Sequence, residues 1–93
     1  MDISCTKVGH GTPAETAVMG HVWQGESKAQ RAYVRVAKSD GEYVSEVRCA
    51  DGSFYIPMLP GDWRVTCFAP HGQSASQRLS VLRGDQFDIE FRL

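Results

Sequence analysis

The sequence lacks the long apolar runs that membrane insertion and export require. No stretch approaches the roughly 20 apolar residues of a membrane-spanning helix. The first residues, M-D-I-S-C-T-K, introduce an acidic side chain at once and do not develop the apolar core of a signal peptide. The three cysteines are an odd number, which gives little basis for a disulfide framework. We therefore expect a protein of the reducing cytoplasm.

An excess of charge of either sign is also missing. Ten Lys and Arg stand against eleven Asp and Glu, and the charged residues are scattered singly along the chain. The most basic stretch, residues 28–38, mixes its basic residues with apolar positions of an expected strand. A protein that tracks phosphates needs a continuous basic stripe. The sequence therefore predicts neither nucleic acid nor a membrane surface as a partner.

Helical periodicity is the third absence. No segment places apolar residues at i, i+3, i+4 and i+7 over ten or more residues without an interrupting Gly or Pro, so no long helix is expected. From residue 17 onward apolar and polar residues alternate, as in strands with one buried face. Turns that contain glycine separate the alternating segments about every ten residues, which is typical of a β-sandwich. Seven strands are predicted, at residues 17–23, 32–37, 42–49, 53–57, 62–69, 77–82 and 86–93.

The alternation also predicts the domain organisation and the core. Ninety-three residues are enough for one hydrophobic core. We expect the sandwich domain at residues 17–93. Residues 1–16 show no period and are predicted to be a flexible lead-in whose removal leaves the fold intact. The strand at 42–49 should be an edge strand protected by Glu46 and Arg48. The expected inward side chains are Val34, Val36, Phe54, Ile56, Trp63, Val65, Cys67, Leu79, Val81, Phe87, Ile89, Phe91 and Leu93.

A family resemblance covers residues 20–93, which read G-H-V … A-Y-V-R-V … S-D-G-E-Y-V-S-E-V … D-G-S-F-Y-I-P … P-G-D-W-R-V-T … F-D-I-E-F-R-L. The pattern resembles the carboxypeptidase regulatory-like domains. Residues 32–69 are more specifically similar to a small actinobacterial family of unknown function named after thiosulfate sulfurtransferases, the SseC-like proteins. The resemblance implies an all-β fold, a seven-stranded antiparallel Greek-key sandwich of the transthyretin-like (prealbumin-like) kind.

Residues that carry catalysis or bind metals are not recognisable in the sequence. His10, His21 and His71 have none of the spacings typical of metal ligands. The hydroxyisourate hydrolases, which share the transthyretin-like fold, end in a Tyr-Arg-Gly-Ser signature that this chain lacks. The tripeptide at residues 83–85, Arg-Gly-Asp, is interpreted as a turn between two strands. We expect no enzyme activity, no metal and no cofactor.

The cysteines divide into two groups. Cys49 and Cys67 occupy strand positions, where a thiol acts as a small apolar side chain and burial leaves it unreactive. Cys5 lies in the expected lead-in near Lys7, where an exposed thiolate could accept sulfur or form a disulfide. A terminal cysteine without a role is the alternative. The resemblance to the SseC-like proteins implies a sulfurtransferase as the partner of such a thiol.

These observations favour a non-catalytic interaction domain that binds a protein partner or a second copy of itself. The expected contact surface is a patch of exposed aromatic side chains. Two alternatives remain open: an accessory role in sulfur transfer through Cys5, and a sandwich that binds carbohydrate or another small ligand with Trp23 and the tyrosines as stacking platforms. The residues of the candidate contact surface are Tyr33, Tyr43, Tyr55 and Phe68.

Overall fold

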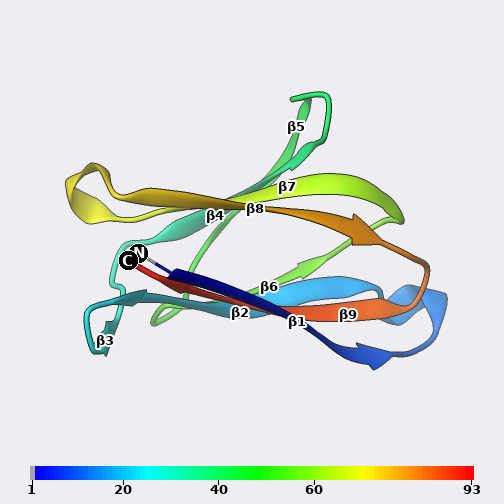
Figure 1. Ribbon diagram of the computed structural model, residues 1–93, viewed down its shortest axis with the longest axis horizontal. Helices are drawn as coiled ribbons and strands as arrows, with labels where there is room; N and C mark the ends of the chain where they lie inside the picture. Colours follow the sequence, from blue (N-terminus) through cyan, green and yellow to red (C-terminus); the bar gives the residue numbers. More distant parts are fainter. Residues whose placement is uncertain (1) are drawn as a thin grey trace.

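The computed structural model describes residues 2–93, with the side chain of Tyr43 left aside, and its strands form two sheets packed face to face (Figure 1). The all-β sandwich expected from the sequence is confirmed. One sheet, called sheet A, has the order β1-β9-β2, and β3 and β6 each pair with β2. The other, sheet B, has the order β5-β4-β7-β8. Sheet A consists of β1 (Asp2–His10), β2 (Ala17–Gln24), β3 (Ser27–Lys28), β6 (Ser53–Pro57) and β9 (Asp85–Arg92), and sheet B of β4 (Tyr33–Lys38), β5 (Tyr43–Arg48), β7 (Gly61–Phe68) and β8 (Ser74–Val81).

The core between the sheets contains the side chains that alternation had assigned to it. Two of these, Phe87 and Leu93, are only partly buried and lie against the edge of the core. Trp63 is buried, and its indole Nε1 donates a hydrogen bond to the Leu59 carbonyl at 2.9 Å, which satisfies its one polar atom. Burial of each large apolar side chain contributes about 1.5–3 kcal/mol to stability. Alternation therefore predicted the inner faces correctly.

The prediction of a flexible lead-in at residues 1–16 is wrong for residues 2–16, and residue 1 lies outside the described residues. Residues 2–10 form β1, which pairs with β9 along its whole length, and a 3₁₀ turn at Pro13–Glu15 follows. Only two side chains of β1, Ile3 and Cys5, pack against the core, and the ladder shifts register between Lys7 and Gly9. An edge strand with so short an apolar pattern gives almost no periodic signal, and its pairing partner lies at the far end of the sequence.

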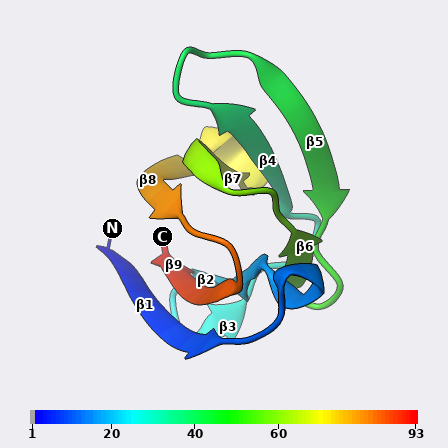
Figure 2. The ribbon, with the colours of Figure 1, turned by 90° about the vertical axis from the view of Figure 1, so that its right-hand side faces the viewer.

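The strand count and one pairing also differ from the prediction. There are nine strands in the described chain instead of seven, because β1 and the two-residue β3 were missed. The pairing of β2 with β9 is parallel, whereas the other pairings are antiparallel. The edge position predicted for β5 is confirmed, and Figure 2 shows β5 on the side of sheet B next to β6. None of the described residues forms a helix long and apolar enough to cross a membrane.

Gly20 makes the parallel pairing of β2 with β9 possible. Its φ is +152°, and a Cβ atom built on it would lie 1.8 Å from the Ile89 carbonyl oxygen. Only glycine allows the two backbones to approach so closely at the middle of sheet A. The pairing then places His21 directly beside Glu90 on the outer face of the sheet.

Candidate interaction surface

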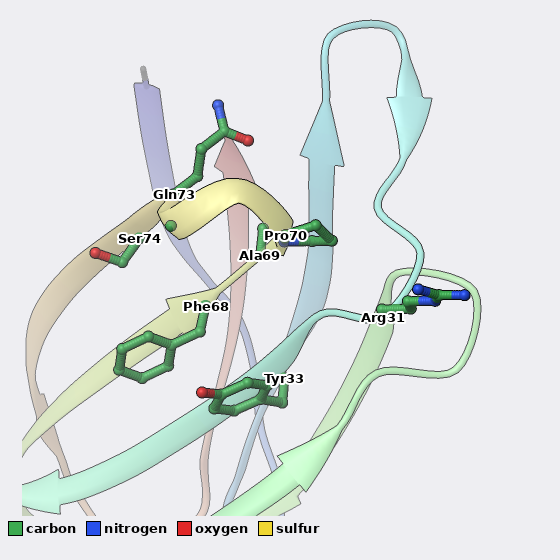
Figure 3. Close-up of a pocket in the computed structure, with 8 residues that line it drawn as sticks. Arg31, Tyr33, Phe68, Ala69, Pro70, Gln73 and Ser74 are labelled. Carbon is green, nitrogen blue, oxygen red and sulfur yellow. The ribbon is translucent and has the colours of Figure 1, made fainter.

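Two aromatic rings stack on the outer face of sheet B. Tyr33 of β4 and Phe68 of β7 are direct cross-strand partners, and their ring centroids lie 5.0 Å apart at an interplanar angle of 20°. Figure 3 shows the two rings side by side at the end of the sheet where the β7–β8 connection turns. Both side chains are half-buried. Cross-strand aromatic pairs of this kind are rigid, amphipathic contact elements.

Arginine side chains border the aromatic pair. The guanidinium carbon of Arg35 lies 5.0 Å from the centroid of the Phe68 ring, and its Nη2 donates to Glu46 Oε2 at 3.1 Å. Arg48 of β5 is the cross-strand partner of Tyr33. The rings are therefore flanked by positive charge on the side of β4 and β5.

Two shallow grooves flank Tyr33 and share Arg31. One has a volume of about 460 Å³, and the other, with a volume of about 440 Å³, is lined by Arg31, Tyr33, Arg48 and Cys49. Arg31 has a φ of 60°, in the left-handed region that favours glycine. The larger groove is lined by Arg31, Tyr33, Phe68, Ala69, Pro70, Gly72, Gln73 and Ser74 (Figure 3).

Positive charge dominates the outer face of sheet B. Among the described side chains, four arginines face outward there against two carboxylates, those of Glu46 and Asp62. Arg64 and Arg78 lie directly opposite each other on β7 and β8, and neither has a carboxylate partner among the residues that the structure describes. Like charges in direct cross-strand positions destabilise a sheet. The four outward arginines are Arg35, Arg48, Arg64 and Arg78.

The predicted patch of four aromatic residues is only partly formed. Tyr33 and Phe68 come together, but Tyr55 lies on β6 in sheet A, where it is 55% exposed and pairs with Met19. The side chain of Tyr43 falls outside the described part of the chain. The prediction of a single surface that includes Tyr55 is therefore wrong, because β6 belongs to the other sheet. Alternation within one strand does not reveal to which sheet that strand belongs.

The environment of Cys5 differs from the exposed, flexible one predicted for it. Cys5 is half-buried in β1, opposite Ile89, and packs against the core. Burial, and secondly the Asp88 carboxylate, raise the pKa of its thiol above the ordinary value. This setting lowers the thiolate fraction on which sulfur chemistry depends.

The burial predicted for the other two cysteines is confirmed, although Cys49 follows β5 instead of lying within a strand. Cys49 and Cys67 are buried, and burial raises the pKa of each thiol to about 11. The thiols are free, with no disulfide among them. Both act as small apolar side chains of the core.

A cluster of three ionisable side chains lies on the outer face of sheet A and was not predicted. His21 of β2 meets Asp88 and Glu90 of β9, and the His21 Nδ1 to Glu90 Oε2 distance is 2.8 Å. Burial and the neighbouring Glu90 raise the pKa of Asp88. Burial alone would raise the pKa of Glu90, but hydrogen bonds from His21, Trp23 and Asp88 outweigh it and lower that pKa. The alternation of β9 had placed both carboxylates on one face, but the parallel pairing with β2 was needed to find His21.

Asp85 is the first residue of β9 and is buried. Its carboxylate lies 2.9 Å from Lys7 Nζ and 3.1 Å from His10 Nδ1, and it accepts a hydrogen bond from the Leu82 amide at 2.9 Å. These contacts lower its pKa from 3.8 to about 2. The Asp side chain of the Arg-Gly-Asp turn is therefore buried in contacts within the fold, in agreement with the interpretation of the tripeptide as a structural turn.

Comparison with known proteins identifies a family and a shared fold. The family model described as "Protein of unknown function (DUF1416)" matches residues 4–90, and no curated protein matches the chain. Among solved structures, the chain is similar to the dioxygenase domain of a dioxygenase carbohydrate-binding protein fusion from the cellulolytic bacterium Streptomyces sp. SirexAA-E. The sequence identity is 15% and the TM-score 0.60, over 83% of this chain and 77% of that chain. At this identity the likeness shows the fold alone, and neither description names the carboxypeptidase regulatory-like or SseC-like proteins.

Proposed function

We propose that this chain, which belongs to the DUF1416 family of proteins of unknown function, is a non-catalytic interaction domain that binds an acidic segment of a partner protein on the outer face of sheet B. The observation that carries the proposal is the stacked pair of Tyr33 and Phe68, which lines the larger groove and is bordered by arginines, with Tyr33 also lining the second groove. Tyr and Arg are among the residues that most often dominate the binding energy of protein interfaces.

The charge of this face is the reason to expect an acidic partner. Arg64 and Arg78 repel each other across β7 and β8 in the isolated chain. A carboxylate of the partner between them would remove that repulsion and form charge-assisted hydrogen bonds. Electrostatic complementarity of this kind increases the association rate and selects the partner. The outer face of sheet B therefore offers both an aromatic anchor and a basic border.

The aromatic pair is less suited to carbohydrate. A sugar stacks on an open ring face, but Phe68 already has the Tyr33 ring and the Arg35 guanidinium against it, each at 5.0 Å. A partner side chain can instead enter the grooves beside Tyr33. A sulfurtransferase, which the resemblance to the SseC-like proteins implies, is one specific protein to test as the partner.

The test compares partner binding by the wild type and by variants on the two sheets. The immobilised domain captures proteins from native lysate, captured proteins are identified by mass spectrometry, and the dissociation constant of each purified candidate, and of a sulfurtransferase, is measured by calorimetry. Tyr33→Ala is expected to weaken binding about 30-fold or more, as at other interface hot spots. Arg48→Glu should slow association and reduce its dependence on salt.

Tyr55→Ala is the matched control, because it removes an exposed tyrosine from the other sheet. Binding by this variant should equal that of the wild type. A partner that binds Tyr33→Ala and Arg48→Glu as tightly as the wild type would exclude the proposed surface. A glycan that binds in a manner dependent on Tyr33, with no protein captured, would replace the proposal with the carbohydrate-binding alternative.

A further inference from the structure

Three side chains of residue types that commonly ligate metals converge on the outer face of sheet A, the sheet opposite the aromatic pair. One donor atom from each of His21, Asp88 and Glu90 lies within 4.8 Å of the other two. All three residues are half-buried, so their donor atoms are held by the surrounding sheet and still reach solvent. The parallel pairing of β2 with β9 sets their positions, since His21 is the direct partner of Glu90, and Asp88 precedes Glu90 by two residues on the same face.

Charge at this position favours a cation. Two carboxylates lie side by side, and the basic group that contacts them is the His21 imidazole. Among the described residues no lysine or arginine forms an ion pair with Asp88 or Glu90. The nearby cations are directed elsewhere, with Lys28 Nζ 5.9 Å and the Arg92 guanidinium carbon 5.6 Å from the centroid of the Trp23 ring.

A neighbouring side chain also orients one of the carboxylates. Trp23 Nε1 donates a hydrogen bond to Glu90 Oε1 at 3.0 Å, which leaves Oε2 directed toward His21. Carboxylate ligands of metal sites are commonly held in this way by a hydrogen bond from outside the ligand set. The rigid indole therefore fixes the orientation of Glu90 before any ion binds.

We propose that His21, Asp88 and Glu90 bind a divalent transition-metal ion such as Zn²⁺ on the outer face of sheet A. One imidazole and two carboxylates form a ligand set that suits Zn²⁺, Co²⁺ and Mn²⁺. Three protein ligands leave at least one position for water or for an anion from solution. Binding replaces the hydrogen bond between His21 Nδ1 and Glu90 Oε2 with a metal bond to each residue, the proton of that hydrogen bond passes to solvent, and the ion neutralises the paired carboxylates.

The first test is calorimetric titration of the full chain with Zn²⁺, with the cysteines kept reduced by a reagent that does not chelate metals. A single ion is expected to bind per chain. Asp88→Asn and His21→Gln, which nearly preserve side-chain shape, should each weaken binding about 10-fold or more, and Trp23→Phe should weaken it to a smaller degree by releasing Glu90. A two-dimensional NMR spectrum of the backbone amides of each variant verifies that its fold is unchanged.

Matched controls separate this site from other ligands in the chain. His71→Ala removes an exposed histidine of the β7–β8 connection, and Cys5→Ser removes the half-buried thiol of β1. Both should bind Zn²⁺ as the wild type does. A loss of binding in either control, or unchanged binding by Asp88→Asn, would overturn the proposal, as would the absence of any binding to the wild type.

Broadening of backbone amide NMR signals by a paramagnetic ion provides an independent test of the site. Substoichiometric Mn²⁺ should broaden amide signals of residues near positions 21, 88 and 90 first and leave those of sheet B sharp. Broadening that is instead centred on Asp62 or Glu46, the carboxylates of sheet B, would place the ion elsewhere and contradict the proposed site.

Discussion

Lys7 Nζ lies 2.9 Å from Asp85 Oδ1, and this ion pair fastens the edge strand β1 to the first residue of β9. Asp85 is 2% exposed, so one partner of the pair is buried while the other reaches solvent. The Gly84 amide beside it donates a hydrogen bond to Thr16 Oγ1 at 2.7 Å. The β8–β9 turn and the segment before β2 are thus held together by a small polar network.

Substitution of Asp85 tests this network. Asp85→Asn removes the negative charge but keeps an acceptor for the Leu82 amide, and we expect the melting temperature at neutral pH to fall by roughly 5 °C or more. Thermal unfolding followed by circular dichroism measures the change. Glu26→Gln, at an exposed turn position, is the control and should leave the melting temperature unchanged. Equal melting temperatures for Asp85→Asn and the wild type would show that the network does not stabilise the fold.

The same carboxylate predicts how stability depends on acid. The pKa of Asp85 is lower in the folded chain, at about 2, than its ordinary value of 3.8, so the unfolded chain binds more protons at low pH. The stabilisation is therefore present above pH 3.8 and is lost as the pH falls toward 2. Urea unfolding across this range should show the wild type losing stability more steeply than Asp85→Asn. Parallel curves for the two proteins would contradict the assignment.

Removal of β1 should damage the fold, contrary to the expectation from the sequence. Deletion of residues 2–10 strips β9 of its antiparallel partner and exposes a hydrogen-bonding edge next to Ile89 and Phe91. Exposed edges of this kind pair with other chains. We expect a lower melting temperature and concentration-dependent association, measured by calorimetry and sedimentation. A monomer with the stability of the full chain would show that β1 is dispensable.

Gly20 should tolerate no side chain. Gly20→Ala would place a Cβ 1.8 Å from the Ile89 carbonyl oxygen, and we expect a loss of about 3 kcal/mol or more in the free energy of unfolding. Gly25→Ala is the control, because Gly25 also has a positive φ, of 63°, but nothing lies within 4 Å of the added Cβ. It should cost about 1 kcal/mol from backbone strain alone. Similar losses for the two variants would mean that the close approach of β2 to β9 is easily relaxed.

The thiols should react slowly in the folded chain. Burial raises the pKa of Cys49 and Cys67 to about 11, and it also raises that of Cys5. We expect alkylation at neutral pH, followed by mass spectrometry, to modify Cys5 first and the other two much later, and all three to react faster in urea. Treatment with thiosulfate and a sulfurtransferase should leave Cys5 without a persulfide. A Cys5 that reacts faster in the folded than in the unfolded chain would restore the hypothesis of thiol chemistry.

Substitution of Arg31 by glycine should stabilise the fold and weaken the binding of an acidic partner. Its φ of 60° is unfavourable for a residue with a side chain, and Arg31→Gly is expected to raise the free energy of unfolding by about 0.5–1 kcal/mol. The substitution also removes a basic side chain that lines both grooves, so affinity for an acidic partner should fall. A variant that is less stable than the wild type would show that the arginine side chain stabilises the turn in a way that outweighs the strain.

The sequence predicted what depends on alternation and missed what depends on pairing. Phe54, Ile89 and Phe91 could be assigned to the core because each strand reports its own inward face. The strand β1 could not be assigned, since it has little apolar pattern and its partner β9 lies more than seventy residues away. For the same reason Tyr55 could not be separated from Tyr33, nor could His21 be placed beside Glu90: each case requires knowing which strands are neighbours.

The position of β9 between β1 and β2 has a consequence for the order of folding. β9 is the last of the described strands in chain order and pairs with both β1 and β2, so β1 has no partner within sheet A until residues 85–92 are available. Sheet B, whose neighbouring strands lie closer together in the sequence, has no such delay. The β2–β3 and β2–β6 pairings do not need β9. Pairing of β1 and β2 with β9 should therefore be the late step that completes sheet A.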